Sequence, residues 1–214
     1  MKRLFILGTS GLAREMAFLF DAVPQTEWEL SGFIAADASE VGRDLGRARV
    51  VGDDAWLIGT SVECGLIIGV GLPAARERIA VRYLSQGSRF EFPTLIHPSA
   101  VLDTRLVELG RGNLITAGCV FTCDIVVGSF NLFNLQTTVG HDARIADFCV
   151  FNPSVNISGG VHVGDTVLVG TGSQILENRV VGPRATVGAG AVVTKDVEAG
   201  VTVVGVPARP LGSG

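Results

Sequence analysis

The sequence predicts a small α/β domain with a Rossmann-like parallel sheet, followed by a left-handed parallel β-helix of hexapeptide repeats. Three observations support this fold class. Apolar strands alternate with helical segments over residues 2–87, which is typical of a parallel sheet. Large apolar residues then recur at every sixth position from 109 to 193, and glycine directly follows seven of them. A period of six fits neither an α-helix nor a simple alternating strand, but it fits a triangular coil.

The first part of the chain begins as a strand, a tight turn and a helix. The strand is expected over residues 2–8, and the amphipathic helix over 12–23. Further strands are expected at 28–35 and 65–71, with a short helix near 53–59. A longer helix over 73–87 begins with Pro73, a residue favoured in the first helical turn. These segments predict the small parallel sheet.

The hexads support the β-helix position by position. Their large apolar residues are Leu109, Ile115, Phe121, Val127, Phe133, Val139, Ile145, Phe151, Ile157, Val163, Val169, Ile175, Val181, Val187 and Val193. The fifth residue of most hexads is small or β-branched, and Arg179 is the clear exception. With three hexads per turn, residues 109–198 form five coils about 24 Å tall. We place the domain boundary near Phe92, giving domains of residues 1–92 and 93–214. An ordinary β-sandwich with accidental spacing is the alternative.

Composition and charge favour a small-molecule partner. The 214 residues carry a net charge of −4 with only 17 Lys and Arg, so the sequence predicts binding to neither nucleic acid nor an anionic membrane. No run of 18 uncharged apolar residues is present, and we expect a cytoplasmic protein. The four cysteines form no CxxC pair and match no histidine cluster, which predicts packed thiols and no metal site.

Two glycine-rich strand ends are candidates for a ligand crevice. The turn Gly8-Thr9-Ser10-Gly11 precedes a helix, whose free backbone N–H groups suit an anionic ligand. Gly69-Val70-Gly71 ends another strand, and open α/β sheets bind ligands at such ends. The turn lacks the full dinucleotide-binding pattern, so these glycines could also serve turn geometry alone.

His141 is the candidate base in the coil. It is the third residue of its hexad and is followed by Asp142, so its side chain should point outward at a corner of the triangle. Coils of this kind commonly form trimers, and a corner histidine can then lie between subunits and accept a proton. A purely structural histidine is the alternative. His97, at the join, and His162 are weaker candidates.

The hexads, together with GTSGLARE, FPTLIHPSAV, VGHDARIADF and VGVPARPL, resemble one family over essentially the whole chain. It is the family of bacterial nucleotide-sugar N-acetyltransferases of the left-handed β-helix type, with sialic acid O-acetyltransferase-like proteins as close kin. The resemblance implies that the first domain binds a nucleotide-linked 4-amino-4,6-dideoxy sugar and that the coil binds acetyl-CoA. It also implies a homotrimer with active sites between subunits, and no metal.

The resemblance also assigns roles to residues. His141 corresponds to the general base, Asp142 to its acidic partner, and Gly159 to the glycine whose N–H polarises the thioester. Gly159 also lies 18 residues, or one full coil, after His141. The implied acetyl-CoA contacts are Gly159, Gly170, Thr171, Gly188, Ala189, Val206 and Pro207, and the nucleotide-sugar contacts are Gly8, Ser10, Gly11, Arg14, Asp37, Gly69 and Gly71. The implied reaction is direct attack of the sugar amine on the thioester, without an acyl-enzyme on Cys123.

One departure from the family pattern bears on the nucleotide. Members that bind UDP-sugars often carry two adjacent acids after the second strand, whereas here Ala36 precedes the single Asp37. One carboxylate can pair with the N1–H and N2–H₂ donors of guanine, so we expect a GDP-linked sugar. Members that act on GDP-perosamine are the nearest match.

The open alternatives are a UDP-linked amino sugar, O-acetylation of a sugar, and a non-catalytic trimeric scaffold. A zinc-dependent hexapeptide carbonic anhydrase is disfavoured, because no coil spacing relates the three histidines.

Overall fold

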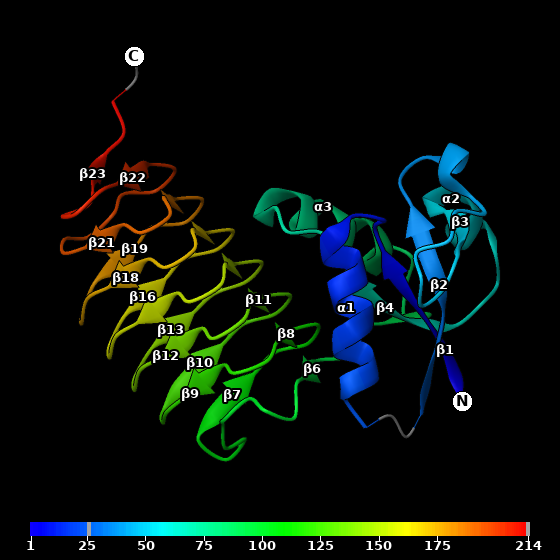
Figure 1. Cartoon of the computed structure of the whole chain (residues 1–214), viewed down its shortest axis with the longest axis horizontal. Coiled ribbons are helices and arrows are strands. Elements are labelled where there is room, and N and C mark those ends of the chain that lie inside the picture. The colour runs from blue at the N-terminus through cyan, green and yellow to red at the C-terminus, as the bar shows by residue number, and fades with distance from the viewer. Residues whose placement is uncertain (25–26, 213–214) are drawn as a thin grey trace.

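The structure, a computed structural model, describes residues 1–24 and 27–212 and consists of an α/β unit beside a long coil of short strands (Figure 1). This arrangement confirms the predicted fold class. In the part of the chain that the structure describes, no helix is both long and apolar enough to cross a membrane.

Five parallel strands form the sheet of the α/β unit, in the order β3-β2-β1-β4-β5. Their bounds are β1 Lys2–Leu7, β2 Trp28–Ala35, β3 Val50–Asp53, β4 Cys64–Ile68 and β5 Phe90–Glu91. The chain adds strands on one side of β1 and later on the other, so β1 and β4 flank the point at which the strand order reverses. Such a point is where open α/β sheets bind ligands.

Helices cover both faces of this sheet. α1 (Gly11–Ala22) buries Ala13, Met16 and Leu19 on one face. α2 (Asp54–Gly59) and α3 (Pro73–Leu84) bury apolar residues on the other, and a short 3-10 helix, η1, spans Ala38–Glu40. The prediction of a strand over 28–35 is confirmed, and the helix expected over 73–87 ends at Leu84.

The coil contains three sheets of parallel strands that run along its length. One contains β7 Val107–Leu109, β10 Ile125–Val127, β13 Arg144–Ile145, β16 His162–Val163 and β19 Val180–Val181. The second contains β6 Leu95–Ile96, β8 Leu114–Ile115, β11 Leu132–Phe133, β14 Val150–Phe151, β17 Leu168–Val169, β20 Thr186–Val187, β22 Thr202–Val204 and the antiparallel β23 Arg209–Pro210. The third contains β9 Val120–Phe121, β12 Thr138–Val139, β15 Asn156–Ile157, β18 Gln174–Ile175 and β21 Val192–Val193. From β7 to β21, paired residues of successive coils are 18 positions apart, as Val127 and Ile145 are, which confirms three hexads per coil.

The coil interior is filled as the hexads predict. Of the fifteen large apolar positions, all but Leu109 are buried, and the small fifth residues such as Cys119, Ala143 and Val161 are buried with them in one continuous cluster. Arg179 is the exception here too, because its side chain is partly exposed and lies 3.7 Å from Asp196. Stacked coils thereby share a core that no single coil could bury.

The turns that connect the three sheets of the coil have a backbone conformation that also repeats every six residues. This repeat was not predicted from the sequence. The fourth residue of every hexad except the last adopts a positive φ, at every sixth position from Gly112 to Gly190. Glycine adopts this conformation without strain, whereas Phe130 and Thr166 adopt it at a cost. The positive φ determines the direction in which the side chains of the third and fourth residues of each hexad point.

The α/β unit packs on the outer surface of the β8-β11-β14 sheet. Leu114, Leu132 and Val150 on that surface share a buried cluster with α1. Arg76 of α3 is fully buried beside this contact and donates from Nε to the Phe130 carbonyl at 3.0 Å and from Nη1 to the Ile68 and Val70 carbonyls. The two parts of the chain are therefore connected by both apolar packing and a buried guanidinium.

Candidate active site

His141 lies at a corner of the coil, in the turn between β12 and β13. Its side chain is 65% exposed, as expected for a third position that points outward. Asp142, the next residue, has a φ of 59°, and its Oδ2 lies 2.7 Å from His141 Nδ1. A carboxylate in this place favours the tautomer in which Nδ1 carries the proton. Nε2 is then the nitrogen that can accept one.

Gly159 lies directly beside the imidazole, one coil further along. A methyl group added at Gly159 would lie 2.6 Å from Nε2 and Cε1 of His141, so any larger residue there would displace the imidazole. The carbonyl of His141 accepts from Gly160 N at 2.8 Å, which holds the two turns together. The Gly159 N–H donates no hydrogen bond within the described residues. The structure therefore brings a histidine, an acid and a free backbone donor to one corner.

Cys123 occupies the corresponding position one coil before His141, and its carbonyl accepts from Asp142 N at 3.2 Å. Partial burial raises the pKa of the Cys123 thiol, and the charges of Asp124 and Asp142 raise it further. A raised pKa reduces the thiolate fraction, which is the nucleophilic form. The thiol is thus poorly suited to covalent catalysis.

The residues expected to contact acetyl-CoA lie at two different corners. Gly159 is beside His141, whereas Gly170, Thr171, Gly188 and Ala189 are in the turns that follow β17 and β20. Val206 and Pro207 lie beyond β22, joined by a cis peptide bond, and the Val206 side chain is exposed. One chain alone does not bring these groups together.

The glycines expected to form the nucleotide crevice meet at the carboxyl ends of β1 and β4. A methyl group on Gly8 would lie 3.2 Å from the Gly69 carbonyl oxygen, and one on Gly71 would lie 3.1 Å from Leu12 of α1. A cavity of about 310 Å³ opens there, lined in part by Gly8, Ala36 and Val70. Its place at the reversal of strand order agrees with the position expected for a ligand.

The other expected nucleotide-sugar contacts surround the crevice without lining this cavity. Ser10 precedes α1 and makes no side-chain capping bond, and Gly11 and Arg14 are exposed in the first turns of that helix. Asp37 Oδ1 accepts from Ser39 N at 2.8 Å and so caps η1, a bond that lowers the pKa of the Asp37 carboxyl. The Ser39 side chain also interacts with this carboxyl and lowers its pKa further.

Three charged residues in the cavity wall were missed by the sequence analysis. Arg78 and Arg82 extend from α3, and Asp54 begins α2. Asp54 pairs with Arg82 and accepts from Tyr83 Oη at 2.6 Å. These residues could have been identified in the sequence by their position on helices that start at the carboxyl edge of the sheet. They give the crevice a net positive charge that suits a phosphate-bearing ligand.

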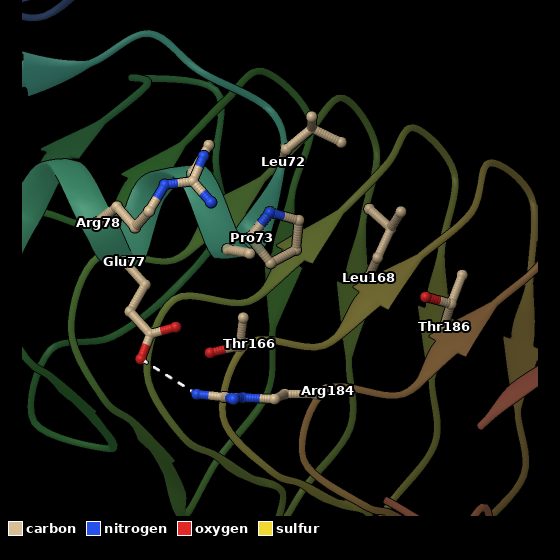
Figure 2. A pocket seen from close by; sticks show the side chains of 10 residues that line it. Leu72, Pro73, Glu77, Arg78, Thr166, Leu168, Arg184 and Thr186 are labelled. Atoms are coloured by element: carbon tan, nitrogen blue, oxygen red, sulfur yellow. Dashed lines mark ion pairs between the residues drawn. The ribbon is translucent and has the colours of Figure 1, made fainter. Parts of the chain in front are cut away.

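A second cavity, of about 450 Å³, lies between the start of α3 and the outer surface of β17 and β20 (Figure 2). Its wall includes Thr166, Arg184 and, on α3, Glu77, whose Oε1 lies 3.5 Å from Arg184 Nη2. Ala75 and Arg78 line both this cavity and the crevice. The two cavities therefore adjoin at the first turns of α3.

The α/β unit that contains the nucleotide crevice lies on one side of the coil, and His141 lies on another. The α/β unit packs on the β8-β11-β14 sheet, whereas His141 is at the corner where the other two sheets meet. Figure 1 shows β12 and β13 on the side of the coil away from α1.

No group of three or more His, Cys, Asp and Glu side chains in residues 1–24 and 27–212 could hold a metal ion. No known family model matches the sequence, and no curated protein sequence does.

Solved structures resemble the chain closely over its whole length. The perosamine N-acetyltransferase PerB from Caulobacter crescentus, in complex with CoA and GDP-perosamine, has 30% sequence identity and a TM-score of 0.88, covering 99% of this chain and 98% of that one. The H141N mutant of that enzyme, with the same ligands, has 29% identity and a TM-score of 0.89, covering 100% and 98%. The acetyltransferase domain of PglB from Neisseria gonorrhoeae, in complex with acetyl coenzyme A, has 28% identity and a TM-score of 0.88, covering 98% and 99%.

The combination of an α/β unit, a β-helix and a histidine corner defines the class of left-handed β-helix acyltransferases. The chain belongs to the family of nucleotide-sugar N-acetyltransferases within that class, as its resemblance to PerB over both full lengths shows. It is accordingly an acetyl-CoA-dependent N-acetyltransferase acting on amino sugars.

Proposed function

We propose that the protein transfers the acetyl group of acetyl-CoA to the 4-amino group of GDP-perosamine, a nucleotide-linked 4-amino-4,6-dideoxy sugar. The observation that carries this proposal is the corner formed by His141, Asp142 and Gly159. The α/β unit, residues 1–92, binds the nucleotide-sugar, and the β-helix, residues 93–214, binds acetyl-CoA. PerB, which resembles this chain, holds CoA and GDP-perosamine in its solved structure.

The proposed reaction is a direct transfer. The nitrogen of the sugar amine attacks the thioester carbonyl carbon, and His141 Nε2 takes the proton that the amine loses. The Asp142 carboxylate stabilises the imidazolium that forms, through the 2.7 Å contact with Nδ1. As the tetrahedral intermediate collapses, the C–S bond breaks and the CoA sulfur leaves with the proton from the imidazolium. Amide and free CoA are the products.

Gly159 acts on the oxyanion of that intermediate. Its N–H has no acceptor among the described residues and lies beside the imidazole, so it is available to the thioester oxygen as negative charge develops there. A backbone donor held in place before the reaction typically contributes a factor of about 10²–10³ in rate. The absence of a Cβ at this position leaves room for both the ring and the acetyl group.

GDP rather than UDP is the proposed nucleotide. Asp37 follows β2 without a second acid beside it, and its side chain is exposed, so its carboxylate can accept from donors of a guanine base. Asp37 Oδ1 already caps η1, which holds the carboxylate in one orientation. The diphosphate then lies toward the arginines of α3.

A homotrimer is the proposed assembly. Because the crevice and His141 lie on different sides of one coil, a complete site needs the crevice of one subunit and the His141 corner of its neighbour. The same arrangement accounts for the acetyl-CoA contacts at two corners, since a neighbouring coil can bring the second corner to the first.

The test is acetyl transfer measured with GDP-perosamine and with its 4-hydroxyl counterpart. We expect turnover with the amine only, and His141→Asn should lower kcat by about 10²–10⁴-fold with little change in either KM. A measurement of thermal shifts with GDP, UDP, CMP and dTDP checks the nucleotide. Full activity of His141→Asn would refute the assigned base, and a shift with UDP but not GDP would refute the assigned nucleotide.

A further inference from the structure

Arg76 of α3 is a fully buried cation at the junction between the α/β unit and the coil. Among the described residues its hydrogen-bond partners are backbone carbonyls: Nε donates to Phe130 at 3.0 Å, and Nη1 donates to Ile68 at 2.8 Å and to Val70 at 2.9 Å. Burial lowers the pKa of the guanidinium, which nevertheless keeps its charge at neutral pH. Because a buried charge is costly unless it is hydrogen-bonded, these directional bonds are what the guanidinium contributes and an apolar side chain could not.

The bonds from Nη1 reach the segment that forms one wall of the nucleotide crevice, which Val70 lines. Gly69 in this segment is held by its N–H, which donates to the Leu7 carbonyl at 2.9 Å. At Val70 and Gly71, by contrast, the bond from Arg76 to the Val70 carbonyl is the one hydrogen bond within the described part of the chain. The conformation of this wall therefore depends on Arg76.

The bond from Nε connects this wall to a fixed point of the coil. The Phe130 N–H donates to the Arg111 carbonyl at 2.8 Å. The Phe130 ring contacts those of Phe92 and Phe148, at centroid distances of 5.1 and 5.3 Å. The Phe130 carbonyl is thus held by the stacked coils, and the planar guanidinium spans the distance from it to the crevice wall. A lysine side chain ends in a single nitrogen, so it cannot occupy the places of both Nε and Nη1.

We propose that Arg76 is a positioning residue for the nucleotide-sugar and that it holds the crevice wall at Val70 in the binding conformation before the ligand arrives. Arg76 does not line the crevice and has no exposed surface, so it acts through the wall. This inference rests on the proposed function, in which the crevice binds the nucleotide. A wall that is ordered in advance lowers the entropy cost of binding, and a bound ligand orders the wall in the same way. Loss of the bonds should therefore weaken binding and leave the turnover of bound substrate nearly unchanged.

Arg76→Lys tests the assignment, because it keeps a positive charge and cannot restore all the bonds of the guanidinium. Calorimetry measures Kd for GDP, and steady-state kinetics measures kcat and both KM values. We expect Kd for GDP and KM for GDP-perosamine to rise together by roughly five- to twentyfold, with kcat within about twofold and KM for acetyl-CoA unchanged. If Arg76→Lys does not fold, Arg76→Gln, which brings no charge into the junction, is measured in its place with the same expected result.

Hydrogen exchange of the Gly69 amide, which donates to Leu7, reports on the wall directly. Without ligand, this amide should exchange at least about fivefold faster in Arg76→Lys than in the wild type, and saturating GDP should bring the two rates close together. The Leu176 amide, which donates to the Val193 carbonyl in another sheet of the coil, should exchange equally in both proteins. Faster exchange at both amides would instead indicate a loss of overall stability and would contradict a positioning role.

Leu132→Ala is the matched control. Leu132 is buried at the same junction, in the cluster shared with α1, and its truncation destabilises the junction without removing a hydrogen bond to the crevice wall. With both variants shown by circular dichroism to be folded at the assay temperature, Leu132→Ala should leave Kd for GDP and both KM values unchanged. An unchanged Kd for GDP in Arg76→Lys would overturn the inference, as would equal weakening in Leu132→Ala or a raised KM for acetyl-CoA.

The two proposals fail in different ways. A wild-type enzyme that neither binds GDP nor acetylates GDP-perosamine would overturn the proposed function. The Gly69 exchange rates without ligand would then still decide whether Arg76 orders the wall, and equal rates in the wild type and Arg76→Lys would overturn that role.

Discussion

Arg76 Nε donates to the Phe130 carbonyl at 3.0 Å, and this bond links α3 to a turn of the β-helix. The same guanidinium donates from Nη1 to the Ile68 and Val70 carbonyls, in the segment that follows β4. Arg76 is fully buried, and its hydrogen-bond partners among the described residues are backbone carbonyls. One side chain therefore connects the crevice to the coil on which the α/β unit packs.

Replacement of Arg76 by methionine should destabilise the protein by about 3 kcal/mol, because it leaves buried carbonyls without donors. Urea denaturation followed by circular dichroism measures the change. Arg47→Met is the control, since Arg47 forms a surface ion pair with Asp21 and its loss should cost less than about 1 kcal/mol. Equal effects of the two substitutions would show that the buried guanidinium does not stabilise the junction.

Gly159→Ala should lower kcat about 100-fold, because the added methyl group would lie 2.6 Å from Nε2 of His141 and must displace the ring. Steady-state kinetics with both substrates measures the effect. Gly59→Ala serves as the control for a glycine-to-alanine change, since an added methyl there would contact nothing within 4 Å. Unchanged kcat in Gly159→Ala would mean that the ring does not need its observed position.

Asp142→Asn should lower kcat about 100-fold while both KM values stay nearly constant. An amide can donate to Nδ1 of His141 and so favours the tautomer in which Nε2 carries the proton and cannot accept another. Asp142→Glu keeps a carboxylate and should retain much more activity than the asparagine variant. If both substitutions leave kcat at the wild-type value, Asp142 does not act on the imidazole.

The period of the coil could be predicted from sequence because the interior admits only large and small apolar side chains in strict order. The pairing of Val127 with Ile145 follows directly from that order. The proximity of Gly159 to His141 could be predicted in the same way, since one coil is 18 residues. In a coil of fixed repeat length, the number of residues between two positions determines how far apart they lie in space.

The positive φ at the fourth position was harder to identify, although Gly112, Asp124, Asp142 and Asn178 are residues that tolerate it. The pattern is difficult to recognise in the sequence because it includes Thr166 and Phe148, two residue types that rarely adopt a positive φ. The charged wall of the crevice was also missed, since Asp54, Arg78 and Arg82 come together only when α2 and α3 pack on the same face of the sheet. Tertiary packing, without a sequence period, positions those groups.

Cys123→Ser should retain kcat within about twofold, because the raised pKa of the thiol leaves little thiolate for attack on the thioester. Partial burial contributes most to that raised pKa, and the charges of Asp124 and Asp142 contribute further. Mass spectrometry of enzyme quenched during turnover with acetyl-CoA should find no acetyl group on Cys123. An acetylated cysteine, with loss of activity in the serine variant, would establish a covalent route in place of direct transfer.

Mixing of two inactive variants should restore activity if the site lies between subunits. His141→Asn keeps the crevice intact, and Arg78→Glu places a negative charge at the proposed diphosphate position but keeps the His141 corner. In randomly mixed trimers, a site is complete when the crevice comes from the first variant and the corner from the second. Each of these conditions is met with a probability of one half, so about a quarter of wild-type activity should return.

The mixing requires that subunits exchange, so the two variants are unfolded and refolded together, and each is refolded alone as the control. Light scattering after chromatography gives the mass of the mixed species, which should equal three chains. A mixture as inactive as its components, at the mass of a trimer, would mean that each chain uses its own crevice and its own His141. The separation of those two features across the β8-β11-β14 sheet argues against that outcome, because a substrate in the crevice would have to reach the far corner of the coil.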